Sequence, residues 1–446
     1  MKKMLMKCLF CLLILCYSNF FKQYVHAEER GITFTLDAKN FLNKEVLTDQ
    51  NRSTFSHTIG EGEITLLASE TISFLYIEFD RIPESYTMIE LKSGKEVQCG
   101  QEQFLHQCID VESKFGEKTK EIQLLFPLET VISDIYVFTE RKLPDWVQVW
   151  EPPCEQADLL LVSSHADDEQ LFFAGILPIY SGEKKHKVQV VYTVQHFEAN
   201  GNYDHQRSHE QLDGLWKVGV KNYPLISSFP DLYAESKDEE TAFLNTLQAY
   251  QSIGITYEDI LGYFVECIRR CKPLVIVSHD LKGEYGHGTH VVTARALTEA
   301  IEKAAVEKEY EGSYLKFGAW QVEKLYLHLY EEGQITLDLD IPLEHFNGKT
   351  AFQVSQDGFQ AHKSQHWTWF YKWIYGTTEK PITKASQIKK YSPCNYGLYF
   401  SNVGPDKNKN DFMENIDTYL VRELEEYKKS KIFRKSKPEL QYEEIR

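Results

Sequence analysis

Three short runs of the sequence are apolar almost throughout, and they constrain the fold more than any other feature. The runs are 158-DLLLVSS-164, 188-VQVVYTV-194 and 273-PLVIVSH-279. A strand that is apolar throughout is buried on both faces, as in a parallel sheet that helices cover on both sides. Helical patterns at 205–219 and 289–304 lie among these runs. This alternation predicts an α/β domain with a Rossmann-like layered parallel sheet.

The sequence before these runs has a different pattern. Short stretches such as 73-SFLYIEF-79 and 121-EIQLLF-126 alternate apolar and polar residues and are separated by turn-forming residues. Regular short strands of this kind favour a β-sandwich. The pattern ends at Pro152 and Pro153, which interrupt any strand.

These patterns divide the chain into four parts. We expect a signal peptide at 1–27, a β-sandwich domain at 28–150, an α/β catalytic domain at 151–376, and a C-terminal extension and tail at 377–446. A glycan-binding role for the sandwich is an expectation by analogy alone.

The first 27 residues have the features of a secretory signal. Lys2, Lys3 and Lys7 precede an apolar core at 8–21, and Ala27 follows at the expected cleavage position. The core is short for a membrane span, so we expect cleavage and a secreted or cell-surface protein, with an uncleaved anchor as the alternative.

The formal net charge of −17 bears on the class of partner. Proteins that bind nucleic acid or anionic membranes normally present a basic face. We therefore expect no nucleic-acid partner, and membrane attachment only if the signal is retained.

Two polar clusters follow two of the buried runs. The first is 165-HADDE-169, and the second is 279-HDLKGEYGHGTH-290. Because ligands bind beyond the carboxyl ends of parallel strands, these clusters are candidates for one site. Two histidines and an aspartate would make a three-ligand catalytic zinc site with an open position. Helix capping by the acidic residues is the alternative for the first cluster taken alone.

The two clusters resemble motifs of the PIG-L/LmbE-like family of zinc-dependent N-acetylglucosaminyl deacetylases. The stretches 164-SHADDE-169 and 283-GEYGHGTH-290 correspond to the family's Ala-His-Pro-Asp-Asp-Glu and Gly-His-x-x-His motifs, and 207–220 is similar to its Arg-x-x-Glu helix. Ser164 and Ala166 depart from the first motif, but neither position supplies a ligand. The resemblance covers about 160 to 305 and neither the N-terminal region nor the tail.

The resemblance implies a role for each residue of the motifs. It implies that His165, Asp168 and His290 hold Zn²⁺, or another divalent metal. Asp167 would be the general base for the attacking water, and His287 would stabilise the oxyanion or protonate the leaving amine. These assignments agree with the need for a base and a proton donor in amide hydrolysis.

The resemblance and the positions of other residues suggest supporting roles. The family pattern favours Arg207 and Glu210 as substrate-binding residues, against the alternative of a surface pair one helical turn apart. Glu169, His279 and Asp280 are expected to orient a ligand histidine, against ordinary loop packing. We interpret 366-HWTWFYKWIYG-376 as a helix that packs on the core, with stacking on sugar rings as the alternative.

Together, the residues and the resemblance predict an exported, zinc-dependent amidohydrolase that removes acetyl from an N-acetylated amino sugar or glycan and releases acetate. Two alternatives remain open: an amidase that acts on another sugar-linked amide, and an inactive glycan-binding protein.

Overall fold

A computed structural model describes residues 34–196, 204–232, 234–419, 421–422 and 425 of the chain. The predicted signal peptide and the end of the tail lie outside these residues. The chain forms two compact units, Met1–Trp150 and Glu151–Arg446. Each unit is described by itself below.

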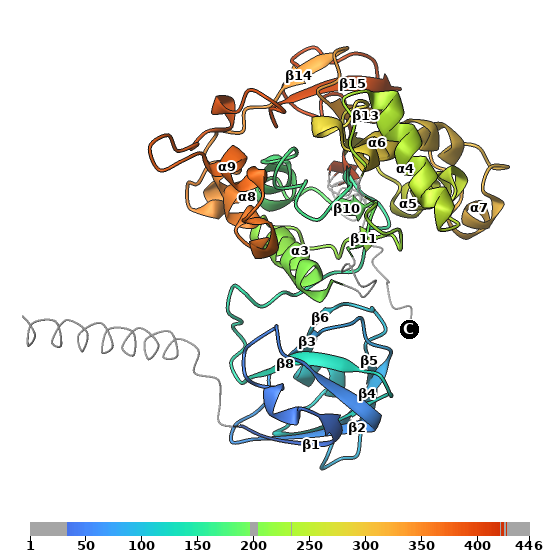
Figure 1. The fold of residues 1–446 in the computed structure, drawn as a ribbon. Helices are drawn as coiled ribbons and strands as arrows, with labels where there is room; N and C mark the ends of the chain where they lie inside the picture. Colours follow the sequence, from blue (N-terminus) through green and yellow to red (C-terminus); the bar gives the residue numbers. More distant parts are fainter. Residues whose placement is uncertain (1–33, 197–203, 233, 420, 423–424, 426–446) are drawn as a thin grey trace, which may run out of the picture. The chain divides into compact units, whose positions relative to one another are not determined.

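The first unit is an antiparallel β structure (Figure 1). Its strands run in the order β5-β4-β7-β2-β8-β3-β6, and β1 pairs with β2. Their bounds are β1 Phe34–Leu42, β2 Ser56–Ala68, β3 Phe74–Phe79, β4 Tyr86–Glu90, β5 Glu96–Cys99, β6 His106–Asp110, β7 Glu121–Phe126 and β8 Val131–Phe138. A short helix, α2 (Val111–Phe115), follows β6.

The long strand β2 joins the two halves of this sheet. Its C-terminal half pairs with β7, and its first two residues pair with β8. The halves meet in the core, where the ring of Phe79 on β3 lies 6.2 Å from that of Phe126 on β7. The expectation of a β-rich N-terminal region is therefore confirmed.

The second unit contains a mixed sheet in the order β11-β10-β9-β12-β13-β15-β14. The strands from β11 to β13 are parallel, and β15 is antiparallel to both of its neighbours. Their bounds are β9 Leu159–Ser163, β10 Val188–Tyr192, β11 Leu225–Ile226, β12 Val275–Ser278, β13 Lys324–His328, β14 Gln334–Thr336 and β15 Asn395–Ser401. This confirms a mixed α/β unit, and each of the three apolar runs contains one of its parallel strands.

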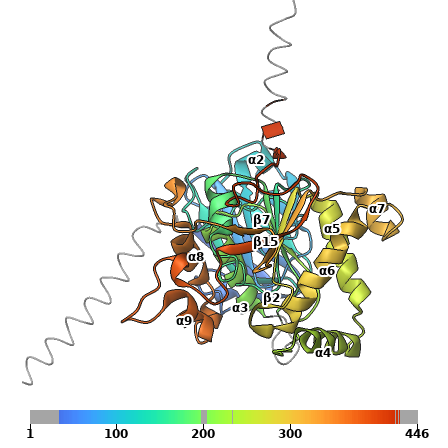
Figure 2. The same cartoon turned by 90° about the horizontal axis from the view of Figure 1, so that it is seen from above.

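Helices flank this sheet. Figure 2 shows α4, α5 and α6 on one side of the sheet and α8 on the other. The helices are α3 His205–Lys217, α4 Glu239–Ser252, α5 Tyr257–Cys271, α6 Gly288–Ala304, α7 Glu311–Phe317, α8 Ala351–Phe359 and α9 Trp369–Tyr375.

Helix α5 illustrates how the helices on one side of the sheet pack against its strands. Thr256 and Asp259 form a capping box that fixes its start. Ile260, Phe264 and Ile268 recur every four residues and are fully buried in the core that α5 and α6 share with the strands. Each such side chain contributes about 1.5–3 kcal/mol on burial.

The predicted boundary at residue 376 is wrong as a division of the fold. Strand β15 lies beyond it, yet β15 pairs with both β13 and β14 inside the sheet. The buried ion pair between Lys324 of β13 and Asp406, at 2.5 Å, attaches the following segment as well. Residues 377–419 therefore belong to the second unit.

The interpretation of 366–376 as a helix that packs on the core is confirmed for α9, whose Phe370 and Trp373 rings lie 6.0 and 5.6 Å from the fully buried ring of Phe172, but it does not hold for every aromatic residue of the segment. Helix α9 has seven residues, and Ile374 is its buried side chain. Trp367 is 85% exposed and Trp369 is 47% exposed. Tertiary context has overridden the usual tendency of aromatic residues to be buried.

In the described part of the chain, no helix combines the length and the apolar character needed to span a bilayer.

Candidate metal and active site

The site lies where two neighbouring parallel strands end. Strands β9 and β12 are paired in parallel, so the loops that follow Ser163 and Ser278 leave the sheet at the same edge. His165 follows the first strand. His290 lies in the first turn of α6, which the loop after the second strand leads into.

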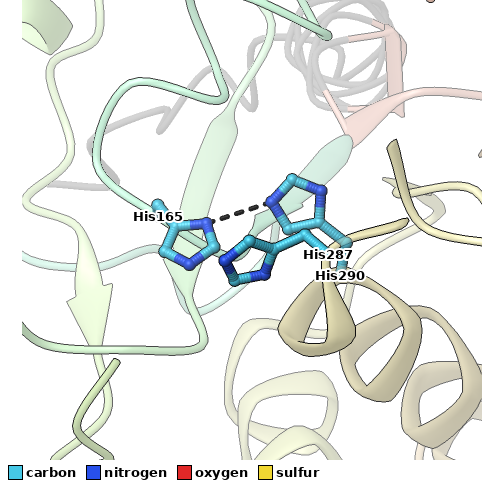
Figure 3. Close-up of side chains that lie close together, drawn as sticks. All are labelled: His165, His287 and His290. Carbon is cyan, nitrogen blue, oxygen red and sulfur yellow. Dashed lines mark hydrogen bonds between the residues drawn. The ribbon is translucent and has the colours of Figure 1, made fainter. Parts of the chain in front are cut away.

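Three side-chain atoms converge at this edge. The Nδ1 atom of His165 lies 3.0 Å from Nε2 of His290 and 3.1 Å from Oδ2 of Asp168. The Nε2 atom of His290 lies 3.3 Å from the same carboxylate oxygen. Figure 3 shows the rings of His165 and His290 pointing toward one another. All three side chains are at most 6% exposed.

The outer nitrogen of each of these two histidines faces a carboxylate. Nε2 of His165 lies 3.1 Å from Asp231, and Nδ1 of His290 lies 2.7 Å from Glu284. A neutral imidazole with its proton on the outer nitrogen donates to that carboxylate and turns its lone pair inward. Two lone pairs and one carboxylate oxygen of Asp168 then face one another, a donor set that can hold a cation.

The ionisation of the histidines points the same way. Burial alone would lower their pKa values, but it is outweighed by neighbouring carboxylates. Asp231 and Asp168 raise the pKa of His165 well above its ordinary value, and Asp168 with Glu284 raises the pKa of His290 to about 9. The cluster therefore favours positive charge, and it could bind a metal.

His279 approaches the cluster but is not available as a ligand. Its Nε2 atom lies 3.6 Å from Asp168. That nitrogen already accepts the backbone N–H of Ser164 at 2.9 Å, while Nδ1 lies 2.7 Å from Glu284. His279 thus fixes the turn after β9, and it shares the carboxylate of Glu284 with His290.

His287 caps α6 and lies beside the cluster. Its ring centroid is 4.7 Å from that of His165 and 4.9 Å from that of His290 (Figure 3). The backbone N–H of Thr289 donates to Nδ1 at 3.3 Å. In the neutral ring the proton is therefore on Nε2, and burial holds the pKa of His287 well below its ordinary value. This tautomer is suited to hydrogen-bond donation through Nε2.

Asp167 occupies a strained position next to the ligand set. Its φ of 131° lies in a region that residues with a side chain rarely adopt. Its N–H donates to Glu169 at 2.9 Å, which holds the turn. Burial raises the pKa of Asp167 to about 6, although the positive charge of Arg207 opposes that rise. A carboxylate with this pKa is suited to take up a proton near neutral pH.

Arg207 is brought to the site from α3. Its side chain is buried, Nη2 donates to the backbone oxygen of Ala166, and the same nitrogen lies 3.6 Å from Asp167. Among the described residues, Nη1 of Arg207 has no hydrogen-bond partner. Because an unpaired buried donor is costly, this nitrogen is a good candidate to bind a substrate oxygen.

The structure does not place Glu210 in a substrate-binding position. Its carboxylate accepts the N–H of Ser364 at 2.8 Å and the hydroxyl of Ser364 at 2.5 Å.

Asp280 differs from the expectation that it orients a ligand histidine. Its side chain accepts the N–H of Lys282 at 3.2 Å, as in ordinary loop packing. Burial raises the pKa of Asp280 to about 6.

Three further residues belong to the site although the sequence analysis did not assign them. Asp231 and Glu284 orient the ligand histidines, and His196 accepts the backbone N–H of Ala166 at 3.2 Å. Glu284 lies within the Gly-rich motif, so an acidic residue close to two histidines was a usable signal. Asp231 and His196 have no motif around them.

Comparison with known proteins identifies the family of this region. Residues 160–301 match the model of the PIG-L family, which is described as GlcNAc-PI de-N-acetylase. All of the histidines and aspartates of the ligand set fall within this range. The family resemblance expected from the motifs is confirmed.

The similar proteins include bacterial enzymes named 1D-myo-inositol 2-acetamido-2-deoxy-alpha-D-glucopyranoside deacetylase. The protein from Segniliparus rotundus is 47% identical over 60 residues, which cover 13% of this chain and 17% of its own. The protein from Mycobacteroides abscessus is 27% identical over 177 residues, which cover 38% and 58%. The chain thus spans less than two thirds of these relatives.

Among solved structures, the N,N'-diacetylchitobiose deacetylase from Pyrococcus horikoshii aligns with 55% of this chain and 84% of its own, at 14% identity and a TM-score of 0.34. The assignment rests on the family model and on the motifs that it covers. Residues 160–301 of this chain are therefore a PIG-L family domain.

Proposed function

We propose that this protein is an exported, zinc-dependent hydrolase that removes the acetyl group from an N-acetylated amino sugar or glycan of the N-acetylglucosamine type. One observation carries the proposal. The inward atoms of His165, Asp168 and His290 converge, and a separate carboxylate orients each histidine from behind.

The donor set fits zinc. Two imidazole nitrogens and one carboxylate oxygen form a three-ligand set of the kind found in catalytic zinc sites, which keep one position open. Their mutual separations of 3.0, 3.1 and 3.3 Å are close to the roughly 3.3 Å expected between tetrahedral ligands with bonds of about 2.0–2.1 Å. A zinc ion held there supplies Lewis acidity, which polarises a carbonyl and makes water acidic near neutral pH.

The protein's own groups then divide the proton transfers. Asp167 takes a proton from the water whose oxygen bonds to the acetyl carbon. Nε2–H of His287 would donate a hydrogen bond to the carbonyl oxygen as that oxygen gains charge, and Asp167 would pass the proton that it took from water to the amide nitrogen as the C–N bond breaks. The products are acetate and a free amine. Nη1 of Arg207 is placed to bind a hydroxyl of the sugar.

The substrate class follows from the family domain. PIG-L is described as a GlcNAc-PI de-N-acetylase, and the curated relatives named above are deacetylases of an acetamido sugar. We extend that chemistry to this chain. Another sugar-linked amide would be cleaved by the same groups, so the acyl group and the sugar must be found by assay.

Export rests on the sequence alone. The basic start, the apolar core and Ala27 support a cleaved signal peptide, with a mature chain that begins near Glu28. The β-rich first unit, proposed as a sandwich, would then be an accessory domain that binds glycan outside the cell. N-terminal sequencing of protein from the medium tests export; a chain that starts at Met1 in the membrane fraction would indicate an anchor.

Acetate release tests the activity. Purified protein is incubated with a panel of N-acetylated amino sugars and their oligomers, with and without a chelator. We expect acetate release that the chelator abolishes and that added zinc restores. The His165→Ala variant should lose most bound zinc and activity, whereas full zinc occupancy in that variant would show that the ligands are misassigned. Release of an acid other than acetate would show that the protein cleaves a different amide. If a zinc-loaded protein releases no acid, the proposed hydrolase activity is refuted.

A further inference from the structure

An open cleft of about 770 Å³ lies in the second unit, outside the ligand cluster. Aromatic side chains form most of its lining, and Glu235 and Lys390 add charged groups. Its aromatic members are Tyr285, Trp367, Trp369, Phe370, Trp373 and Tyr391. The volume is in the range of small-molecule binding sites.

The exposure of these aromatics indicates a binding surface. Trp367 is 85% exposed and Trp369 is 47% exposed, although both are large apolar side chains. A contiguous exposed apolar patch with polar groups at its edge usually marks an interaction site. The mixture of flat rings and charged groups is suited to a ligand that has both C–H faces and hydroxyl groups.

Tyr285 connects this cleft with the ligand cluster. Its ring centroid lies 5.7 Å from Trp369 and 5.6 Å from Phe370 on the cleft side. On the other side it lies 5.5 Å from His287 and 5.4 Å from His290. The backbone of Glu235, which also lines the cleft, forms a β-bridge with His287. The cleft therefore adjoins the reacting groups, with the Tyr285 ring and the Glu235 backbone between them.

The segment that carries the tryptophans of the cleft is held in place by hydrogen bonds to neighbouring elements. Glu210 of α3 accepts two hydrogen bonds from Ser364, three residues before Trp367. The indole N–H of Trp373 donates to the backbone oxygen of Lys390 at 3.1 Å. Gln356 of α8 donates to the backbone oxygen of Ile374 at 2.8 Å. A segment fixed in this way loses little freedom on binding, which favours affinity.

We propose that this cleft binds the sugar units adjoining the unit that is deacetylated, so that the protein acts on an oligosaccharide rather than on a single amino sugar. This inference rests on the proposed function. The C–H face of a pyranose ring can lie on the indoles of Trp367 and Trp369, while its ring hydroxyls reach Glu235 and Lys390. A bare acyl chain would leave those two charged groups without hydrogen-bonding partners from the ligand.

Binding is tested with the zinc-loaded, full-length Asp167→Asn chain, which should not turn the ligand over. The probes are N-acetylglucosamine and its β-1,4-linked tetramer, measured by calorimetry. We expect the tetramer to bind at least tenfold more tightly than the monomer. Trp367→Ala and Trp369→Ala should each weaken tetramer binding by roughly tenfold, the loss that removal of one stacked aromatic commonly causes, and should leave monomer binding unchanged.

Tyr371→Ala is the matched control. Tyr371 lies on α9, as Trp369 does, and is 37% exposed, but it does not line the cleft. This variant should bind the tetramer as tightly as the parent chain. Equal weakening by Tyr371→Ala and by the tryptophan variants, or equal affinities for monomer and tetramer, would overturn the inference.

Turnover separates this inference from the proposed function. In the otherwise native enzyme, the tryptophan variants should lower kcat/KM for the tetramer and not for the monomer. Deacetylation without dependence on length or on the tryptophans would overturn the cleft assignment and leave the proposed function intact. Tetramer binding that depends on the tryptophans but is followed by no deacetylation would support the cleft assignment and overturn the proposed function. Binding of decanoate in place of the tetramer, lost in the same variants, would assign the cleft to an acyl chain and overturn the inference.

Discussion

Glu284 provides the sharpest test of how the site is held together. Its carboxylate is fully buried and meets the Nδ1 atoms of three histidines: His279 at 2.7 Å, His290 at 2.7 Å and His328 at 2.6 Å. The first fixes the turn after β9, and the second is a proposed ligand. A change at Glu284 therefore acts on the metal site without removing a ligand.

The hydrogen bonds also define where the charge is. Nε2 of His328 lies 2.9 Å from the backbone oxygen of Ser392, which can only accept, so that nitrogen carries a proton. Burial alone would raise the pKa of Glu284, but the surrounding histidines hold that pKa well below its ordinary value. Glu284 is therefore a carboxylate, and each nitrogen of His328 faces an acceptor: Nδ1 faces Glu284 and Nε2 faces the backbone oxygen of Ser392.

Two substitutions of Glu284 should therefore differ sharply in how much stability they remove. In Glu284→Ala, three buried N–H groups lose their acceptor at about 1–3 kcal/mol each, so the loss of stability is at least about 3 kcal/mol. In Glu284→Gln, the amide oxygen can accept from His279 and His290, while the amide nitrogen can donate to Nδ1 of His328. Because every buried polar group then keeps a hydrogen-bond partner, we expect a loss of about 1 kcal/mol or less.

The metal affinity should respond as well. A neutral amide behind His290 makes that ligand less basic than a carboxylate does, and changes of this kind typically weaken metal binding by about 10- to 100-fold. The assay pairs thermal unfolding of metal-stripped protein with zinc titration against a chelating dye. Equal destabilisation by both substitutions would show that the amide of Glu284→Gln does not satisfy the three histidines. Wild-type zinc affinity in Glu284→Gln would refute the role of Glu284 in orienting the ligand.

Two further predictions concern carboxylates with distinct roles. Asp167→Asn should retain zinc and lose turnover by roughly 10²- to 10⁴-fold, whereas Asp168→Asn should lose zinc and activity together; equal zinc loss in both, measured beside activity, would contradict this division. In the first unit, burial raises the pKa of Asp134 to about 7, so the folded state holds a proton that the unfolded state releases above about pH 4, and stability falls as pH rises from about 4 to 7. Asp134→Asn should therefore gain about 1–2 kcal/mol relative to wild type between pH 5 and pH 8, after a discount for solvent screening; a difference independent of pH in denaturant unfolding would contradict the shift.

The parts of the fold that the sequence predicted share a physical cause. The continuous apolar runs contain β9, β10 and β12, because strands buried on both faces need apolar residues at every position. The polar residues that follow these runs mark the site for the same reason, since a histidine or an aspartate directly after a fully apolar strand stands out in the sequence.

The parts that were missed lack such a local cause. Strand β15 (Asn395–Ser401) has a mixed burial pattern, and its partners β13 and β14 lie about 60 residues or more before it. The exposure of Trp367 and Trp369 depends on contacts made by α3 and α8, which the local pattern does not contain. Aromatic residues at helical spacing favour burial, so the pattern predicted that α9 packs on the core but not that these two tryptophans are exposed.

The same distinction applies within the site. The proposed metal ligands follow the ends of the parallel strands β9 and β12, because reacting atoms must converge there. Residues that position them face no such restriction: Glu284 comes from the same loop as His290, whereas Asp231 reaches His165 across 66 positions of sequence. Yet these two carboxylates determine which lone pairs point inward. The motifs therefore predict the ligands, while Glu284 within the second motif and Asp231 outside any motif orient the two ligand histidines.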